Sequence, residues 1–202
     1  MCKETGIVLL ENNGILPLDS GSSIKLLGAY NDFRITAIGA SLIKPRWTLT
    51  VSEAIERSGA LSICDNAETA LFFISRGSGE NKDNRPIKGE YYLTDEEKAE
   101  LSEAAAKYKN LIIILNTGYP IEMGFIRGLG ASAVIWTGFS GQRGSESLID
   151  ILCGKVNPSG RLADTWPTDY YDSPSAKNFI NLDDNSPLLS LIHISEPTRR
   201  VV

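Results

Sequence analysis

A loop dense in glycine and charge holds the residues whose types and spacing best suit chemistry. It follows an apolar run at residues 70–74 and carries Glu80 between two arginines, Arg76 and Arg85. The run has the length and composition of a strand buried on both faces of a parallel sheet, and open α/β sheets bind ligands beyond the carboxyl ends of such strands. A carboxylate flanked by arginines is typical of sites where ionisation is controlled. The alternative is an ordinary solvated loop, and the local sequence does not decide between the two.

Other motifs in the chain are better explained by structure than by ligand binding. Residues 128–133 match the dinucleotide pattern G-x-G-x-x-A but come before an expected strand instead of after one, so we reject that interpretation. Residues 138–144 follow a strand and lead into a helix, yet they lack the lysine of a phosphate-binding loop, and close packing of helix on sheet explains their glycines. Cys2, Cys64 and Cys153 are far apart and suggest neither a disulfide framework nor a zinc site. We therefore expect no cofactor and no metal.

Apolar runs and helix signals alternate along the chain. This pattern predicts a three-layer α/β/α sandwich around a mostly parallel sheet of about five or six strands. Two capping boxes, Thr50 with Glu53 and Thr94 with Glu97, mark helix starts. Strands are expected at residues 24–27, 61–64, 70–74, 111–115 and 133–136, with an edge strand at 161–166. Helices are expected at residues 3–11, 50–59, 94–108 and 122–127, and in a stretch that includes residues 148–152.

Composition excludes several classes of partner. The 202 residues are enough for one domain with a substantial core. The net charge is −5 and no cluster of lysine and arginine stands out, so we expect no nucleic acid partner. No apolar run approaches the length that crosses a bilayer, so we expect no membrane partner either. The cell compartment is left open, with the cytoplasm slightly favoured.

The two ends of the chain differ in character from the middle. We predict a sandwich domain at residues 1–167 and a linker or docking tail at residues 168–188, which are polar and have no clear period. Residues 189–202 look like a translated sequencing adapter, so we expect them to be non-native and His193 to have no function. The chain starts almost inside its first element, which suggests that the true amino terminus lies elsewhere.

Taken together, these segments resemble the C-terminal α/β sandwich domain of glycoside hydrolase family 3, the β-glucosidase-like enzymes. The matching pieces occur in the family's order and cover nearly all of the chain before the adapter-like tail. They are residues 6–12 with 16–18, the Ser-Arg-Gly-Ser-Gly-Glu run at 75–80, residues 115–118, residues 141–142, and the Asn-Pro-Ser-Gly-Arg-Leu run at 157–162.

The resemblance implies one half of a retaining, exo-acting β-glycosidase that acts on a β-glucoside or an oligosaccharide. In this family the nucleophile is an aspartate on a barrel domain, and Glu80 matches the position of the general acid/base. Such a mechanism needs two carboxyl groups about 5 Å apart with different ionisation. The barrel is absent from these residues, so we expect the chain alone to be inactive. The residues expected to bind substrate or hold the loop are Arg76, Ser78, Asp83 and Arg85.

The chain departs from the family pattern in two places. The loop is one residue longer than usual between Glu80 and Arg85, and the common Gly-Gln-Glu reads Gly-Gln-Arg at residues 141–143. Because the acid/base varies among subfamilies, Glu90 stands as a weaker candidate. The alternative function is a stand-alone, non-catalytic α/β module that binds carbohydrate or regulates a partner.

Overall fold

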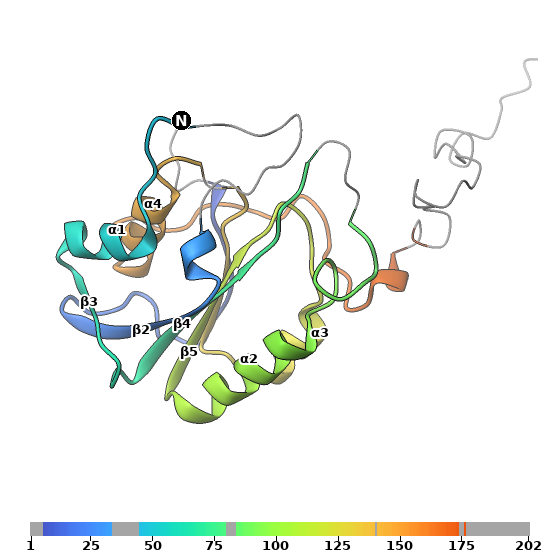
Figure 1. The fold of residues 1–202 in the computed structure, drawn as a ribbon, viewed down its shortest axis with the longest axis horizontal. Helices are drawn as coiled ribbons and strands as arrows, with labels where there is room; N and C mark the ends of the chain where they lie inside the picture. Colours follow the sequence, from blue (N-terminus) through green and yellow to red (C-terminus); the bar gives the residue numbers. More distant parts are fainter. Residues whose placement is uncertain (1–5, 34–44, 80–83, 140, 174–175, 177–202) are drawn as a thin grey trace, which may run out of the picture.

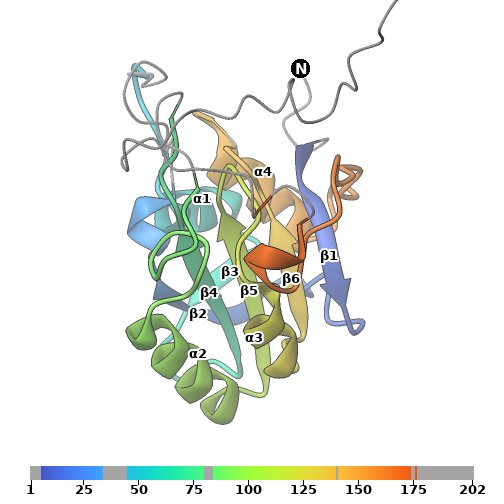
Figure 2. The same cartoon turned by 90° about the vertical axis from the view of Figure 1, so that its right-hand side faces the viewer.

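Six strands form a single sheet. The computed structural model describes residues 6–33, 45–79, 84–139, 141–173 and 176. The strands are β1 (Val8–Asn12), β2 (Ser22–Gly28), β3 (Leu61–Ile63), β4 (Thr69–Ser75), β5 (Asn110–Asn116) and β6 (Ala133–Trp136). Their order across the sheet is β1-β6-β5-β4-β2-β3 (Figures 1 and 2). All neighbours are parallel except β1, which runs antiparallel to β6. The prediction of a mostly parallel sheet is therefore confirmed.

Helices cover both faces of the sheet and complete three layers. The helices are α1 (Val51–Ser58), α2 (Asp95–Lys107), α3 (Met123–Gly128) and α4 (Gly144–Leu152). One face carries α1 and α4 and the other carries α2 and α3 (Figures 1 and 2). Along β4, Leu71 and Phe73 join the core beneath α1 and α4, while Phe72 and Ile74 join the core beneath α2 and α3. Because both faces are buried, the strand is a continuous apolar run and does not alternate with polar residues.

Both predicted capping boxes are present and fix where two helices begin. Thr50 and Thr94 each accept a hydrogen bond from the backbone N–H three residues later, and the glutamate at that position accepts one from the threonine N–H. These reciprocal bonds satisfy N–H groups that have no partner inside the helix. Gly59 ends α1 with a left-handed φ of 61°, which a residue without Cβ adopts at little cost.

The amino-terminal segment corrects one prediction. The sequence predicts a helix at residues 3–11, but β1 occupies Val8–Asn12 and pairs with β6, with a register shift between Leu9 and Glu11. A short apolar run has no period that separates helix from strand. The exposed edge of β6 decides the outcome, because its unpaired backbone groups are satisfied by a neighbouring strand.

The expected edge strand at residues 161–166 is also wrong. That segment is irregular, because β1 already occupies the edge beside β6 (Figure 2). Trp166 instead packs edge-on against Trp136 of β6, with ring centroids 5.4 Å apart. The segment therefore covers the core beneath α2 and α3 without pairing in the sheet.

Gly28, at the end of β2, is a position where a side chain should be costly. Its φ is +67°, and an added Cβ would lie 2.5 Å from the carbonyl oxygen of Phe73. We expect Gly28→Ala to lower the free energy of unfolding by at least about 2 kcal/mol, from backbone strain and overlap together. Urea denaturation measures this effect.

Gly59→Ala is the matched control for that change. Gly59 has a similar φ of +61°, but no atom lies within 4 Å of an added Cβ. Its free energy of unfolding should fall by the backbone strain alone, about 1 kcal/mol. Equal losses in the two variants would mean that the contact with Phe73 carries no energy.

Within the described residues, no helix is both long and apolar enough to cross a membrane.

Candidate active site

Three loops meet beyond the carboxyl edge of the sheet. They follow β4, β5 and β6, and Gly118 in the second loop lies beside residues of the other two. A Cβ added to Gly118 would lie 2.7 Å from Ser78 Oγ and 2.6 Å from the ring of Phe139. Only glycine fits without displacing one of these groups. Ser78, one of the expected site residues, thus lies where the neighbouring loops converge.

Two of the expected site residues lie outside the described part of the chain. These are Glu80 and Asp83, and the residues on either side of them, Gly79 and Asn84, are described. The roles assigned to Glu80 and Asp83 therefore stay predictions.

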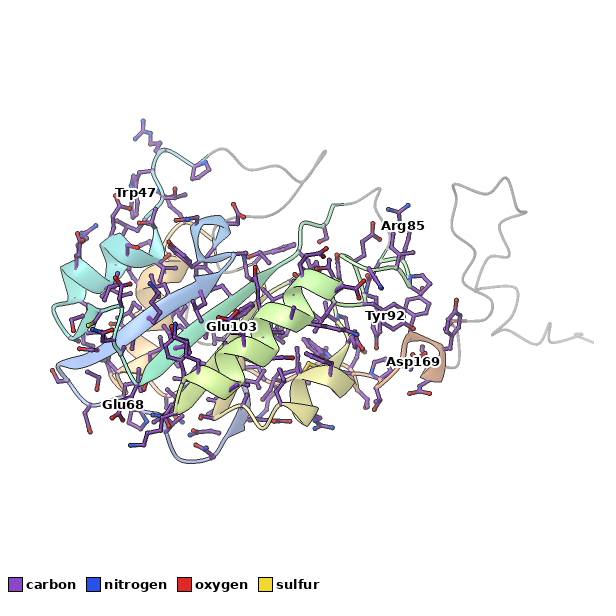
Figure 3. All side chains as sticks on the ribbon, turned by 60° about the horizontal axis from the view of Figure 1, so that its bottom comes forward. Trp47, Glu68, Arg85, Tyr92, Glu103 and Asp169 are labelled. Atoms are coloured by element: carbon purple, nitrogen blue, oxygen red, sulfur yellow. The ribbon has the colours of Figure 1, made fainter. Side chains whose placement is uncertain are left out.

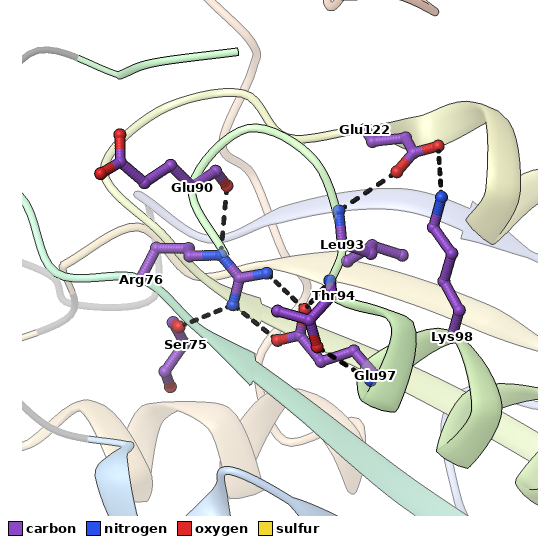
Figure 4. Close-up of polar contacts among 8 residues, drawn as sticks. All are labelled: Ser75, Arg76, Glu90, Leu93, Thr94, Glu97, Lys98 and Glu122. Carbon is purple, nitrogen blue, oxygen red and sulfur yellow. Dashed lines mark hydrogen bonds and ion pairs between the residues drawn. The ribbon is translucent and has the colours of Figure 1, made fainter. Parts of the chain in front are cut away.

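Arg76 anchors the start of the loop. It is 7% exposed, and its guanidinium donates to both carboxylate oxygens of Glu97 at 2.7 and 2.6 Å (Figure 4). It also donates to the backbone oxygens of Ser75 and Glu90. Because Glu97 belongs to the capping box of α2, Arg76 ties the loop to the first turn of that helix. A two-pronged pair between arginine and carboxylate is geometrically specific as well as strong.

A second ion pair lies on the far side of the undescribed residues. Arg85 donates through Nε to both carboxylate oxygens of Glu90 at 3.1 and 3.0 Å, and through Nη2 to one of them. The backbone N–H of Arg85 also donates to Glu90. The structure therefore pairs the expected substrate-binding arginine with the weaker candidate for the acid/base. Glu90 would have to leave this pair before acting on a substrate.

Tyrosine hydroxyl groups hold the segment after residue 166 against the loop. Tyr91 donates to the backbone oxygen of Pro167 at 3.0 Å, and Tyr92 donates to a carboxylate oxygen of Asp169 at 2.9 Å (Figure 3). Tyr170 donates to the backbone oxygen of Asn84 at 3.3 Å. Sequence reasoning missed these contacts, because the partners lie 76 to 86 residues apart. The described part of the predicted tail therefore packs on the domain.

These contacts raise the pKa values of two tyrosines. Burial, with the nearby Asp169 carboxylate, raises the pKa of Tyr91 to about 12. Burial, with the hydrogen bond to Asp169, raises the pKa of Tyr92 to about 12. The neutral phenol is favoured in the folded chain, because an ionised phenolate there would lose water and meet a negative charge.

The raised pKa values predict a loss of stability in strong alkali. Unfolded tyrosine ionises near pH 10, so the stabilisation is complete below about pH 10 and is lost as pH rises toward about 12. In the parent chain, the free energy of unfolding from urea denaturation should fall between about pH 10 and pH 12. In the double variant Tyr91→Phe/Tyr92→Phe it should fall less steeply over the same range. The exposed Tyr171 gives the control, Tyr171→Phe. An unchanged slope in the double variant would contradict this assignment.

No cluster of three or more potential metal ligands occurs in the residues that the structure describes. Cys64 and Cys153 are free thiols.

Comparisons with known proteins agree on one family. The sequence model of the glycosyl hydrolase family 3 C-terminal domain matches residues 7–193. A β-glucosidase from Ruminococcus albus is 31% identical over 88% of this chain. Thermostable β-glucosidase B from Acetivibrio thermocellus is 26% identical over 90% of it. The chain spans only 23% and 27% of those two relatives.

Solved structures show the same relationship. β-Glucosidase 3B from Thermotoga neapolitana, in complex with glycerol, superposes with a TM-score of 0.80 and 27% identity. The match covers 86% of this chain and 31% of that one. The sheet order, the loops gathered at its carboxyl edge and these matches lead to one conclusion: the chain belongs to glycosyl hydrolase family 3 and corresponds to the C-terminal domain of its β-glucosidase-like members.

Proposed function

We propose that this chain supplies the general acid/base, Glu80, to a retaining β-glucosidase whose nucleophile lies on a separate barrel domain. The observation that carries the proposal is the anchoring of the loop on both sides of Glu80. The Arg76–Glu97 pair fixes its start, and the Arg85–Glu90 pair lies just beyond it. A loop held in this way can present a side chain in a defined direction at the carboxyl edge of the sheet, which limits the loss of rate from misplacement.

The chemistry proceeds in two steps. First, Glu80 gives its proton to the glycosidic oxygen while the barrel's carboxylate attacks the sugar, so the bond to the leaving group breaks as a glycosyl-enzyme bond forms. Glu80, now ionised, then takes a proton from water, and the hydroxide displaces the enzyme carboxylate from the sugar. The substrate class follows from the relatives, which are named as β-glucosidases. One of the solved relatives was crystallised with glucose.

Activity of the isolated chain tests the division of the site. Without a nucleophile opposite Glu80 there is no covalent intermediate, so we expect the purified chain to release no phenol from an activated aryl β-glucoside. Adding the separately expressed barrel domain of a family member that pairs with it should give turnover. Activity of the chain alone that disappears in Glu80→Gln would contradict the proposal, since it would require a nucleophile within these 202 residues.

A further inference from the structure

We propose that a pocket beside the tyrosine contacts binds a neutral saccharide. The pocket lies between the 84–91 segment, the turn after β5, and residues 164–173 with Ala176, and it has a volume of about 620 Å³. That size is within the range of about 300–1,000 Å³ of small-molecule sites. Its lining includes the side chains of Asn84, Tyr91, Tyr119, Asp164, Tyr170 and Asp172. The site goes beyond the proposed catalysis because it does not need Glu80. Only the choice of a glucose-based test ligand rests on the proposed β-glucosidase function.

The aromatic wall of the pocket is fixed before any ligand arrives. The rings of Tyr91 and Tyr170 pack edge to face, with centroids 5.3 Å apart at 81°. Their hydroxyl groups donate to the backbone oxygens of Pro167 and Asn84. Tyr91 is 2% exposed, so it supports the wall from behind, and the half-buried ring of Tyr170 offers the surface to a ligand. Because these contacts hold the Tyr170 ring, little freedom is left to lose on binding. The C–H face of a sugar ring packs well on such surface.

The charge of the pocket selects among ligands. Asp164 and Asp172 line it, and neither lysine nor arginine is among the described residues that do so. Phosphates and carboxylates would be repelled. A fully apolar ligand would pack on the rings, but it would strip water from the carboxylates without replacing the lost hydrogen bonds. A neutral ligand rich in hydroxyl groups avoids the repulsion and also replaces the water on the carboxylates, because each hydroxyl can donate to a carboxylate oxygen.

Titration of the purified chain with cellobiose, followed by calorimetry or NMR, tests the proposal. We expect saturable binding, and clearly weaker binding of cellobionate, the oxidised form that carries a carboxylate. Tyr119→Ala removes one lining ring and should weaken cellobiose binding about tenfold. Asp164→Asn should weaken it several-fold and narrow the preference for cellobiose over cellobionate.

Trp47→Ala is the control for non-specific stacking. Trp47 is 47% exposed and lies at the opposite end of the molecule from Tyr92 and Asp169 (Figure 3), so its loss should leave binding unchanged. Urea midpoints check that each variant folds. If Tyr119→Ala does not fold, Tyr119→Phe, which keeps the ring and should still bind, and Asp164→Asn carry the test.

Three results would overturn the proposal. One is the absence of saturable cellobiose binding near the solubility limit of the sugar. Another is cellobionate binding as tightly as cellobiose. The third is a loss of binding in Trp47→Ala but not in the pocket variants. Glu80→Gln should leave cellobiose binding unchanged, so a failure of the acid/base role and a failure of the pocket are distinguishable.

Discussion

Replacing Glu80 by glutamine in the complete enzyme is expected to lower the rate on an alkyl β-glucoside by about 10²–10⁴-fold. This is the usual contribution of a positioned general acid/base. Glutamine has the same shape but no proton to give, so substrate binding should be nearly unchanged. Substrates with good leaving groups need less protonation and should lose less in the first chemical step. Steady-state kinetics on an alkyl and an activated aryl glucoside measure both effects.

A second measurement separates loss of the base from general damage. Azide attacks the glycosyl-enzyme without needing a base, so it should restore turnover of the aryl glucoside in Glu80→Gln and yield a glycosyl azide. Glu90→Gln is the matched control: it disturbs the Arg85 pair and should show neither azide rescue nor dependence on the leaving group. An unchanged rate of Glu80→Gln on the alkyl glucoside would remove Glu80 from the mechanism. Rescue in Glu90→Gln alone would transfer the role to Glu90.

Arg76→Ala should destabilise the folded chain strongly, because it breaks a buried ion pair. The guanidinium is 7% exposed and its partner Glu97 is 22% exposed. Removing it takes away both guanidinium bonds of the Glu97 carboxylate, which keeps the bond from the Thr94 N–H, and the bond that Nε donates to the backbone oxygen of Glu90. Breaking a buried pair in this way costs about 3–5 kcal/mol. We expect that loss in the free energy of unfolding, measured by urea denaturation.

Arg127→Ala is the control on the surface. Arg127 pairs with Glu11, but it is 68% exposed and its partner 34%, so the loss should be about 1 kcal/mol or less. Glu97→Gln isolates the charge, because glutamine also serves in a capping box. Its loss of free energy of unfolding should lie between those of Arg76→Ala and Arg127→Ala. A loss in Arg76→Ala no larger than that in Arg127→Ala would show that Arg76 does not anchor the loop.

Local sequence is sufficient where a residue's partners lie a few positions away. The capping boxes at Thr50 and Thr94 are predicted correctly because each closes within three residues. The central parallel strands β4 and β5 are predicted correctly because burial on both faces demands a continuous apolar run. The described start of the candidate loop, residues 76–79, lies at the carboxyl edge because it directly follows β4.

The tertiary structure decided whatever depends on contacts between distant parts of the chain. The segment Val8–Asn12 is a strand only because β6 presents an open edge, and no period within it could reveal that. The carboxylate that holds Arg76 lies 21 residues away, inside a helix whose acidic residues suggest only a solvated face. The contacts of Tyr91 and Tyr170 with residues 76 and 86 positions away have no sequence pattern at all. Amino-acid type limits which bonds a side chain can make, but only the folded chain determines which partner comes within reach.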